Sequence, residues 1–357
     1  SLIVTLPNPL SKEWVLIYNH MDVQPAEEKE WETDPFSPLE KDGALFGRGS
    51  TDDKGPALSV VYAIKFLQEQ QKNNPDAMLP NIQLLYETEE EIGSPNFGAV
   101  LEVAKKEQLL HTPNSILISD TIFDGEHPSI TYKLRGAVRV FLELETASKE
   151  AHSGTTGGAA VNPLEVLSRA IVSCKNAEGK IIVPGFLDDV LPLTEEEKIQ
   201  TREAAARFNI SKFMQDTGLN ELSSNSAEEI LTRIWHLPTL EMHGFEGVQT
   251  TPGVIKTAIP NKVVAKLTMR LVPRQDPEKL LGLLQNHVRK IHPHISVQGG
   301  GNPACVTPIE NEYTLLGRDA CAFGFGKPAV FVAGGGSIGS IPPMQKMFPS
   351  VPVVMIA

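Results

Sequence analysis

Three separate stretches of the chain are apolar runs that end at side chains able to bind a metal ion. They are Val15 to Asp22, Ile82 to Glu91 and Ser115 to Asp120. Short apolar runs closed by polar residues are typical of the buried strands of a parallel sheet. Ligands bind such sheets beyond the carboxyl ends of the strands, so we expect the histidine and carboxylates to converge at one edge.

Strand and helix patterns alternate from residue 15 to about 130. Pro56 opens one predicted helix, and a second is predicted from Phe97 to Leu110. This alternation predicts an α/β fold, with a mostly parallel sheet flanked by helices.

The pattern changes after residue 134. An alternating strand runs from Val138 to Leu144, and a strand, a helix and a strand lie between Lys262 and Gln298, as in a small α+β sandwich. Apolar strands of the first type return after residue 303. We therefore predict one domain formed by residues 1–134 and 304–357, with a second domain of residues 135–303 inserted into it.

Composition narrows the possible functions. The formal net charge is -12 and no run is rich in lysine or arginine, which argues against nucleic acid and anionic membranes as partners. No apolar stretch approaches the roughly 20 residues that span a bilayer. The three cysteines are far apart and lack Cys-x-x-Cys spacing, so a disulfide framework is not expected and a reducing cytoplasm fits best.

The first candidate ligands lie in two short segments. His20 and Asp22 share one face of an extended segment, where a carboxylate can orient a metal-binding imidazole. A structural hydrogen bond is the alternative for this pair. Asp52 and Asp53 follow a glycine-rich turn directly before a helix, so they are either metal ligands or helix-capping residues.

An acidic cluster at Glu87, Glu89, Glu90 and Glu91 follows the second apolar run. Acidic clusters usually form a solvated face. Here the cluster lies at the same predicted sheet edge as the other candidates, where mutual repulsion is costly without cations. One glutamate can bind a metal while its neighbour acts as a general base.

These motifs resemble the cocatalytic zinc peptidases that include carnosinases, aminoacylases and succinyl-diaminopimelate desuccinylases, and the carnosinase or cytosolic dipeptidase branch in particular. The resemblance covers residues 13 to 357. The segments that carry it are His20 to Pro25, Trp31 to Phe36, Asp42 to Pro56, Glu90 to Ser94, Ile118 to Asp120 and Ala151 to Gly154.

The resemblance implies a catalytic domain, an inserted domain that acts as lid and dimerisation unit, and two divalent metal ions. Zinc is the first expectation and manganese the second. The implied ligands are His20 and Asp120 for one metal, Asp52 as a bridge and Glu91 for the other metal. Glu90 is then the general base and Asp22 orients His20. The implied reaction is attack of an activated water on a peptide bond of a dipeptide or short peptide.

The resemblance also implies a homodimer and four substrate-binding residues. His152 is expected to reach the partner's active site, although a plain loop histidine is the alternative. Arg270 is expected to bind a substrate carboxylate, and a surface ion pair is its alternative. Gly336 and Ser337 belong to a glycine-rich turn expected to line the substrate site; this turn lacks the Gly-Lys-Ser/Thr ending of a nucleotide-binding loop.

One departure from the family pattern leaves other functions open. The family places a further histidine ligand shortly after the strand that corresponds to Val351 to Ala357, and the sequence stops before it. We therefore expect a segment of a longer polypeptide, or a homologue with impaired catalysis that binds metal or dimerises. An amidohydrolase that cleaves N-acyl amino acids is a further alternative, because it uses the same catalytic residues.

Overall fold

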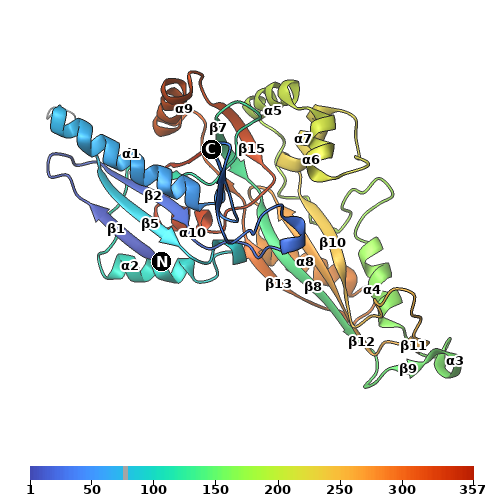
Figure 1. The fold of residues 1–357 in the computed structure, drawn as a ribbon. Coiled ribbons are helices and arrows are strands. Elements are labelled where there is room, and N and C mark those ends of the chain that lie inside the picture. Colours follow the sequence, from blue (N-terminus) through green and yellow to red (C-terminus); the bar gives the residue numbers. More distant parts are fainter. Residues whose placement is uncertain (75–78) are drawn as a thin grey trace.

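The computed structural model describes residues 1–74 and 79–357, which form two main β-sheets (Figure 1). The larger sheet has eight strands, in the order β1-β5-β2-β6-β16-β7-β14 with β15 paired to β7. They are β1 (Leu2–Leu6), β2 (Trp14–His20), β5 (Asn81–Glu87), β6 (Ser115–Ile118), β7 (Ser129–Leu134), β14 (Cys305–Val306), β15 (Val330–Gly334) and β16 (Val353–Ile356).

The smaller sheet has four antiparallel strands in the order β10-β12-β8-β13. They are β8 (Gly136–Glu145), β10 (Thr239–Glu246), β12 (Lys262–Leu271) and β13 (Ser296–Asn302). Two short pairs complete the strands: β3 (Leu39–Lys41) with β4 (Ala44–Phe46), and β9 (Ala151–His152) with β11 (Ala258–Ile259).

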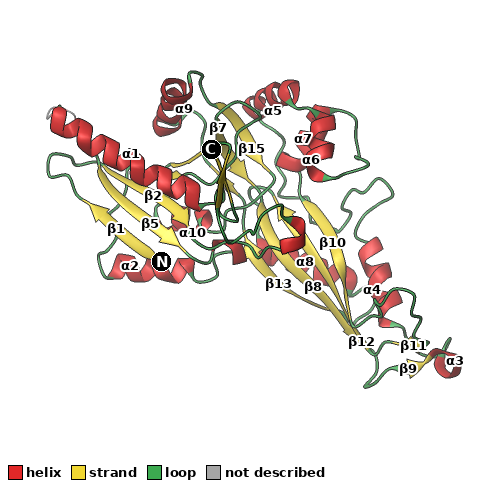
Figure 2. Ribbon diagram, viewed as in Figure 1, coloured by secondary structure: helices red, strands yellow, loops and turns green. Residues whose placement is uncertain are grey.

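Helices lie against both sheets, as the red ribbons of Figure 2 show. The helices are α1 (Lys54–Asn73), α2 (Phe97–Lys106), α3 (Ser153–Thr156), α4 (Pro163–Val172), α5 (Glu195–Arg207), α6 (Ile210–Thr217), α7 (Ala227–His236), α8 (Pro277–Val288), α9 (Glu312–Phe325) and α10 (Ile341–Met347). Short 3-10 turns occur at Glu28–Glu30 and Glu90–Ile92. None of the helices in the described part of the chain has both the length and the apolar character needed to cross a membrane.

The centre of the larger sheet is buried on both faces. Ile17 of β2 packs with Val60 and Ile64 of α1 on one face. Its neighbour Tyr18 packs with Phe97 of α2 on the other. Successive side chains of a strand point to opposite faces, so a strand covered twice must be apolar at nearly every position. The predicted α/β fold with helices flanking a mostly parallel sheet is confirmed.

The antiparallel strands of the larger sheet were not predicted. β5, β2, β6 and β16 are parallel, whereas β1 pairs antiparallel with β5, and β7 pairs antiparallel with β16. Residues 119–128, between β6 and β7, contain no helix. A parallel crossover usually needs about a dozen residues or more and a helix, so a short connection of this kind returns the chain in the opposite direction.

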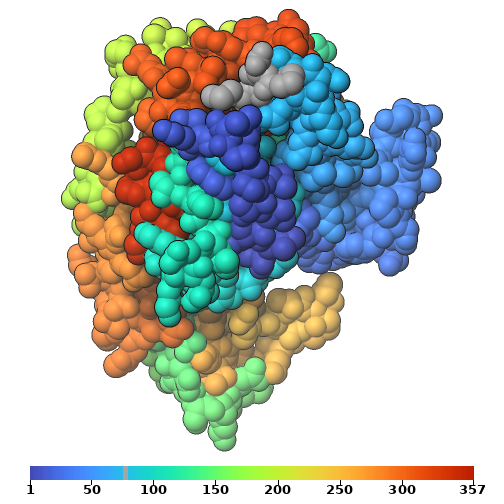
Figure 3. Space-filling view, turned by 90° about the vertical axis from the view of Figure 1, so that its left-hand side faces the viewer, coloured from blue at the N-terminus to red at the C-terminus, as the bar shows by residue number. Residues whose placement is uncertain are grey.

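The smaller sheet is covered on one face only. Its inward residues, such as Val140 and Leu142, pack with α4 and α8, while Arg139 and Phe141 alternate with them on the open face. The sheet ends in a tip formed by β9, β11 and α3, which protrudes at the lower end of the molecule in Figure 3.

The predicted domain boundaries after residues 134 and 303 stay a prediction. The strands of the smaller sheet do lie between residues 136 and 302. Part of the same segment nevertheless packs elsewhere: Leu231 and Trp235 of α7 lie in a core cluster with Tyr132 of β7 and Phe331 of β15.

A buried polar network links these helices to the larger sheet. Lys133 of β7 is 5% exposed and donates to Glu197 Oε1 at 2.6 Å and to His236 Nδ1 at 3.0 Å. Since the ammonium group has only donors, Nδ1 accepts, and the proton of the neutral imidazole lies on Nε2, which is 2.9 Å from Thr201 Oγ1. Burial, and then the positive charge of Lys133, lower the pKa of His236 to about 4.

This network predicts a specific loss of stability in acid. Unfolded His236 takes up a proton near its ordinary pKa of 6.5, while the folded side chain stays neutral down to about 4. The free energy of unfolding should therefore fall as the pH drops from about 6.5 to 4, by up to about 3 kcal/mol from this residue. Urea denaturation between pH 4 and 7 measures it, and His236→Gln should flatten this part of the profile. A variant profile as steep as that of the unsubstituted protein would contradict the assignment.

Candidate metal centre

Three parallel strands deliver candidate ligands to one edge of the larger sheet. β2 ends at His20, β5 leads into the turn that holds Glu90 and Glu91, and Asp120 follows the end of β6. Asp52 reaches the same place from the segment before α1. A cavity of about 490 Å³ is lined by Asp52, Glu90, Glu91 and Asp120.

His20 is the buried centre of this group, with an exposed fraction of 1%. Its Nδ1 lies 3.1 Å from the Asp22 carbonyl oxygen and 3.4 Å from Asp22 Oδ1, and its Nε2 lies 2.8 Å from Asp52 Oδ1 and 3.9 Å from Asp120 Oδ1. An imidazole with its proton on Nδ1, next to Asp22, would direct the Nε2 lone pair toward Asp52 and Asp120. That is the orientation a metal-binding histidine needs.

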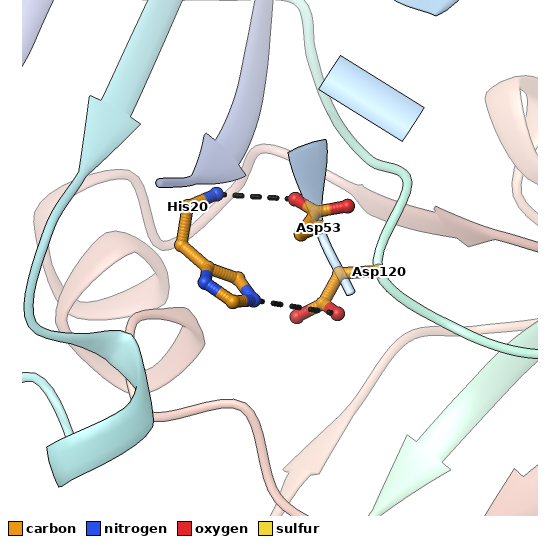
Figure 4. A group of neighbouring side chains, drawn as sticks. All are labelled: His20, Asp53 and Asp120. Atoms are coloured by element: carbon orange, nitrogen blue, oxygen red, sulfur yellow. Dashed lines mark hydrogen bonds and ion pairs between the residues drawn. The ribbon is translucent and has the colours of Figure 1, made fainter. Parts of the chain in front are cut away.

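Asp53 joins the group, which favours the first of the two roles that the sequence allows it, metal ligand or helix-capping residue. One ring nitrogen of His20 and one carboxylate oxygen from each of Asp53 and Asp120 all lie within 4.8 Å of one another, and Figure 4 shows the three side chains facing one another. Asp53 occupies the N-cap position of α1, but its side chain does not cap the helix. Its Oδ2 instead accepts from Asn19 Nδ2 at 2.8 Å and from the His20 amide at 3.1 Å. These two hydrogen bonds hold the end of β2 in place. In the sequence, only the pair of adjacent acids at positions 52 and 53 pointed to Asp53.

Asp22 connects His20 to the acidic turn. Its two carboxylate oxygens accept the backbone N–H groups of Glu90 at 3.2 Å and of Glu91 at 3.0 Å. The side chain of Glu91 accepts from the Gln24 amide at 3.1 Å and from Gln24 Nε2 at 2.9 Å. Glu90 Oε1 accepts the Gly339 N–H at 3.3 Å. The turn is thus held in place by hydrogen bonds and is not a free, solvated face.

The carboxylates are crowded enough to disturb their protonation. Burial raises the pKa of Glu90 to about 7 and that of Asp53 to about 6. Burial and the charge of Asp53 raise the pKa of Asp120. Burial acts to lower the pKa of His20, but Asp120 and Glu90 raise it above its ordinary value. Divalent cations would relieve this repulsion, and the mixture of one imidazole with several carboxylates suits zinc and tolerates manganese.

A second group of predicted residues lies beside the acids. Arg270, at the end of β12, donates from Nη1 to Ser337 Oγ at 2.9 Å, and Ser337 Oγ donates to the Arg135 carbonyl at 2.6 Å. Arg135 Nε in turn donates to the Gly335 carbonyl at 3.0 Å. Gly336 and Ser337 line the cavity. Arg135 had not been singled out, because an arginine in a strand-to-strand link carries no distinctive sequence signal.

His152 is not part of this arrangement within the chain. It is exposed, lies on β9 and pairs with Ala258 in the tip. The tip extends beyond the end of β8 at Glu145, whereas Arg270 pairs with Ala137 at the opposite end of the sheet. Figure 1 shows this separation. A role in the partner's active site therefore stays a prediction.

The sequence of this chain is similar to those of several known proteins. The model of "Peptidase family M20/M25/M40" matches residues 16–351. Beta-Ala-His dipeptidase of Homo sapiens is 31% identical over 360 residues, covering 98% of this chain and 68% of that protein. Cys-Gly metallodipeptidase DUG1 of Saccharomyces cerevisiae is 36% identical over 283 residues, covering 78% of this chain and 57% of that protein. The chain thus aligns with less than two thirds of the yeast protein's length.

The fold is similar to that of solved members of the same group. An M20 family metallo-carboxypeptidase from Sulfolobus solfataricus matches with a TM-score of 0.90 and 28% sequence identity. The match covers 99% of this chain and 78% of that one.

The position of Asp22 predicts its effect on metal binding. Asp22→Asn removes the negative charge next to His20 Nδ1 and replaces one of the two oxygens that accept the backbone N–H groups of Glu90 and Glu91. We therefore expect the affinity for Zn²⁺ to fall about 10- to 100-fold. Isothermal titration calorimetry of the metal-free protein measures this. Asp319→Asn, at an exposed acid of α9, is the control and should leave the affinity unchanged. Equal affinity in Asp22→Asn would show that Asp22 has no orienting role.

Proposed function

Because this chain belongs to the M20/M25/M40 family of peptidases, we propose that it hydrolyses the peptide bond of dipeptides or short peptides with the help of two divalent metal ions. One observation carries the proposal: four carboxylates and a glycine-serine turn line one cavity, a buried histidine contacts two of these carboxylates, and Arg270 is bonded to the turn. The dipeptidase names of the relatives favour dipeptides over N-acyl amino acids as substrates.

We assign the metal ligands from these positions. His20 and Asp120 would hold one cation, Asp52 would be shared, and Glu91 would serve the other cation. Asp53 is an additional candidate, because its Oδ1 is buried and makes no hydrogen bond. When bound, the cations supply positive charge that polarises a carbonyl group and makes a water molecule more acidic.

Glu90 is the proposed general base. It is the acid in this group whose carboxylate is held by the Gly339 N–H beside the glycine-serine turn, and burial brings its pKa to about 7. A base of this strength accepts a proton from water near neutral pH and returns it to the leaving amine. Asp22 acts as a positioning residue for both His20 and the turn that carries Glu90.

Arg270 is the proposed anchor for the free carboxyl terminus of the substrate. Its guanidinium is partly buried, and the described residues place no carboxylate within ion-pair distance of it. A guanidinium without an acidic partner favours a carboxylate ligand, which it binds through two parallel hydrogen bonds. Gly336 and Ser337 would contact the substrate next to it.

We further propose that the protein forms a homodimer and is located in the cytoplasm. A homodimer through the smaller sheet would bring His152 of one chain toward the cavity of the other, where an imidazole can stabilise a developing oxyanion. All three cysteines, Cys174, Cys305 and Cys321, are free and buried, in keeping with a reducing cytoplasm.

Replacing the proposed base gives a direct test. We expect Glu90→Gln to lower kcat for dipeptides by about 10²- to 10⁴-fold, because the carboxamide cannot accept the proton. Metal content, measured by atomic emission, should stay the same. The matched control is Glu89→Gln, whose side chain bonds to Asn96 and does not line the cavity. Full activity in Glu90→Gln would remove the assignment.

Metal removal tests the proposal as a whole. Dialysis against a chelator should abolish dipeptide hydrolysis, and addition of Zn²⁺ or Mn²⁺ should restore it. The assay includes N-acetyl amino acids beside dipeptides, so that faster cleavage of the former would identify an N-acyl amidohydrolase. Metal binding without turnover of either substrate would favour the third possibility, a metal-binding homologue that is not catalytic.

A further inference from the structure

A second cavity lies on the other side of the acidic turn. It has a volume of about 710 Å³ and shares Glu90, Glu91 and Ser337 with the first cavity. Residues 92–95 form one wall, and the ends of β8, β12 and β13 form the opposite wall. The two cavities therefore adjoin each other at the acidic turn.

Two arginines project from the wall formed by the smaller sheet. Arg139 pairs with Thr268 across β8 and β12, and Arg270 pairs with Ala137. Both arginines are thus on the open face of the sheet, in diagonal positions on neighbouring strands. Diagonal neighbours of this kind lie about 7–8 Å apart, with their Cβ atoms somewhat closer, and long side chains at such positions can reach one another. Two guanidinium groups on such neighbours can bind two carboxylates of one small ligand.

Neither arginine is neutralised by the part of the chain that the structure describes, where no acid forms an ion pair with Arg139 or with Arg270. The two acids that line the cavity are already engaged, since Glu90 accepts from Gly339 and Glu91 accepts from Gln24. In the proposed enzyme they also face the metal ions.

Arg139 makes one hydrogen bond to the turn that it touches. Its Nη2 donates to the Ile92 carbonyl at 3.3 Å, which uses one of its five N–H donors. Asn302 Nδ2 already binds the next carbonyl, that of Gly93, at 3.3 Å. Arg139 is largely exposed toward the cavity that it lines, so most of its donors remain available to a ligand.

We propose that Arg139 makes this cavity a subsite for an acidic side chain on the carboxyl-terminal residue of the substrate. Arg270 then binds the α-carboxylate and Arg139 the side-chain carboxylate, so that dipeptides ending in Asp or Glu are preferred. The inference rests on the proposed peptidase function and adds a specificity-determining residue to it.

The test compares two peptides of nearly equal shape, Ala-Glu and Ala-Gln, which differ in one charge. With the metal-loaded protein, we expect kcat/KM for Ala-Glu to exceed that for Ala-Gln by about tenfold or more, as a charge-assisted hydrogen bond supplies. Arg139→Gln should reduce the ratio to near one, mainly through a higher KM for Ala-Glu. Arg139→Lys, which keeps the charge and loses the planar fork, should give an intermediate ratio.

The control variant is Lys266→Gln, at a cation on the same strand as Arg270 that pairs with Glu246 away from the cavity. It should leave the ratio unchanged. Equal rates for the two peptides in the unsubstituted protein would overturn the subsite but leave the peptidase function intact. A loss of both activities in the same proportion in Arg139→Gln would show that Arg139 only supports the turn. Absence of hydrolysis of any dipeptide would overturn the function and the subsite together.

Discussion

The mutual repulsion of buried carboxylates around His20 is the constraint on which the candidate centre depends. Parallel strands bring their carboxyl ends to one edge, so residues distant in sequence are forced into contact there. Asp22 and Asp53 accept backbone N–H groups, which offsets part of the cost of burying their charge. The acids that remain without such partners make the edge suited to cations.

The position of the smaller sheet decides which side chains lie opposite those acids. Arg270 stands at the end of β12 and contacts Ser337, which follows β15 of the larger sheet. Arg135, in the link between β7 and β8, makes two hydrogen bonds to the same turn: its carbonyl accepts from Ser337 and its guanidinium donates to the Gly335 carbonyl. These bonds tie the two sheets together beside the acidic turn and leave the arginine side of the cleft positively charged.

Much of the fold followed from local patterns. The buried strands β2, β5 and β6, helix α1, and the strand, helix and strand from β12 to β13 all lie where their periodicity predicts them. The antiparallel strands β1 and β7 were missed, because pairing direction depends on connections and neighbours and not on the strand's own residues. The packing of α7 on the larger sheet was missed for the same reason: an apolar helix face does not specify its partner.

The sequence by itself determined the kinds of candidate ligand and their order along the chain, because side chains able to bind a metal directly after apolar strands are visible as a pattern. It also identified Arg270 and Ser337 separately, through their resemblance to a family. Only the tertiary structure decided that these two residues touch, that Asp53 turns from the helix toward His20, and that Arg139 shares a face with Arg270. Such contacts depend on strand register and on the packing of distant segments, and neither is encoded in any single stretch of residues.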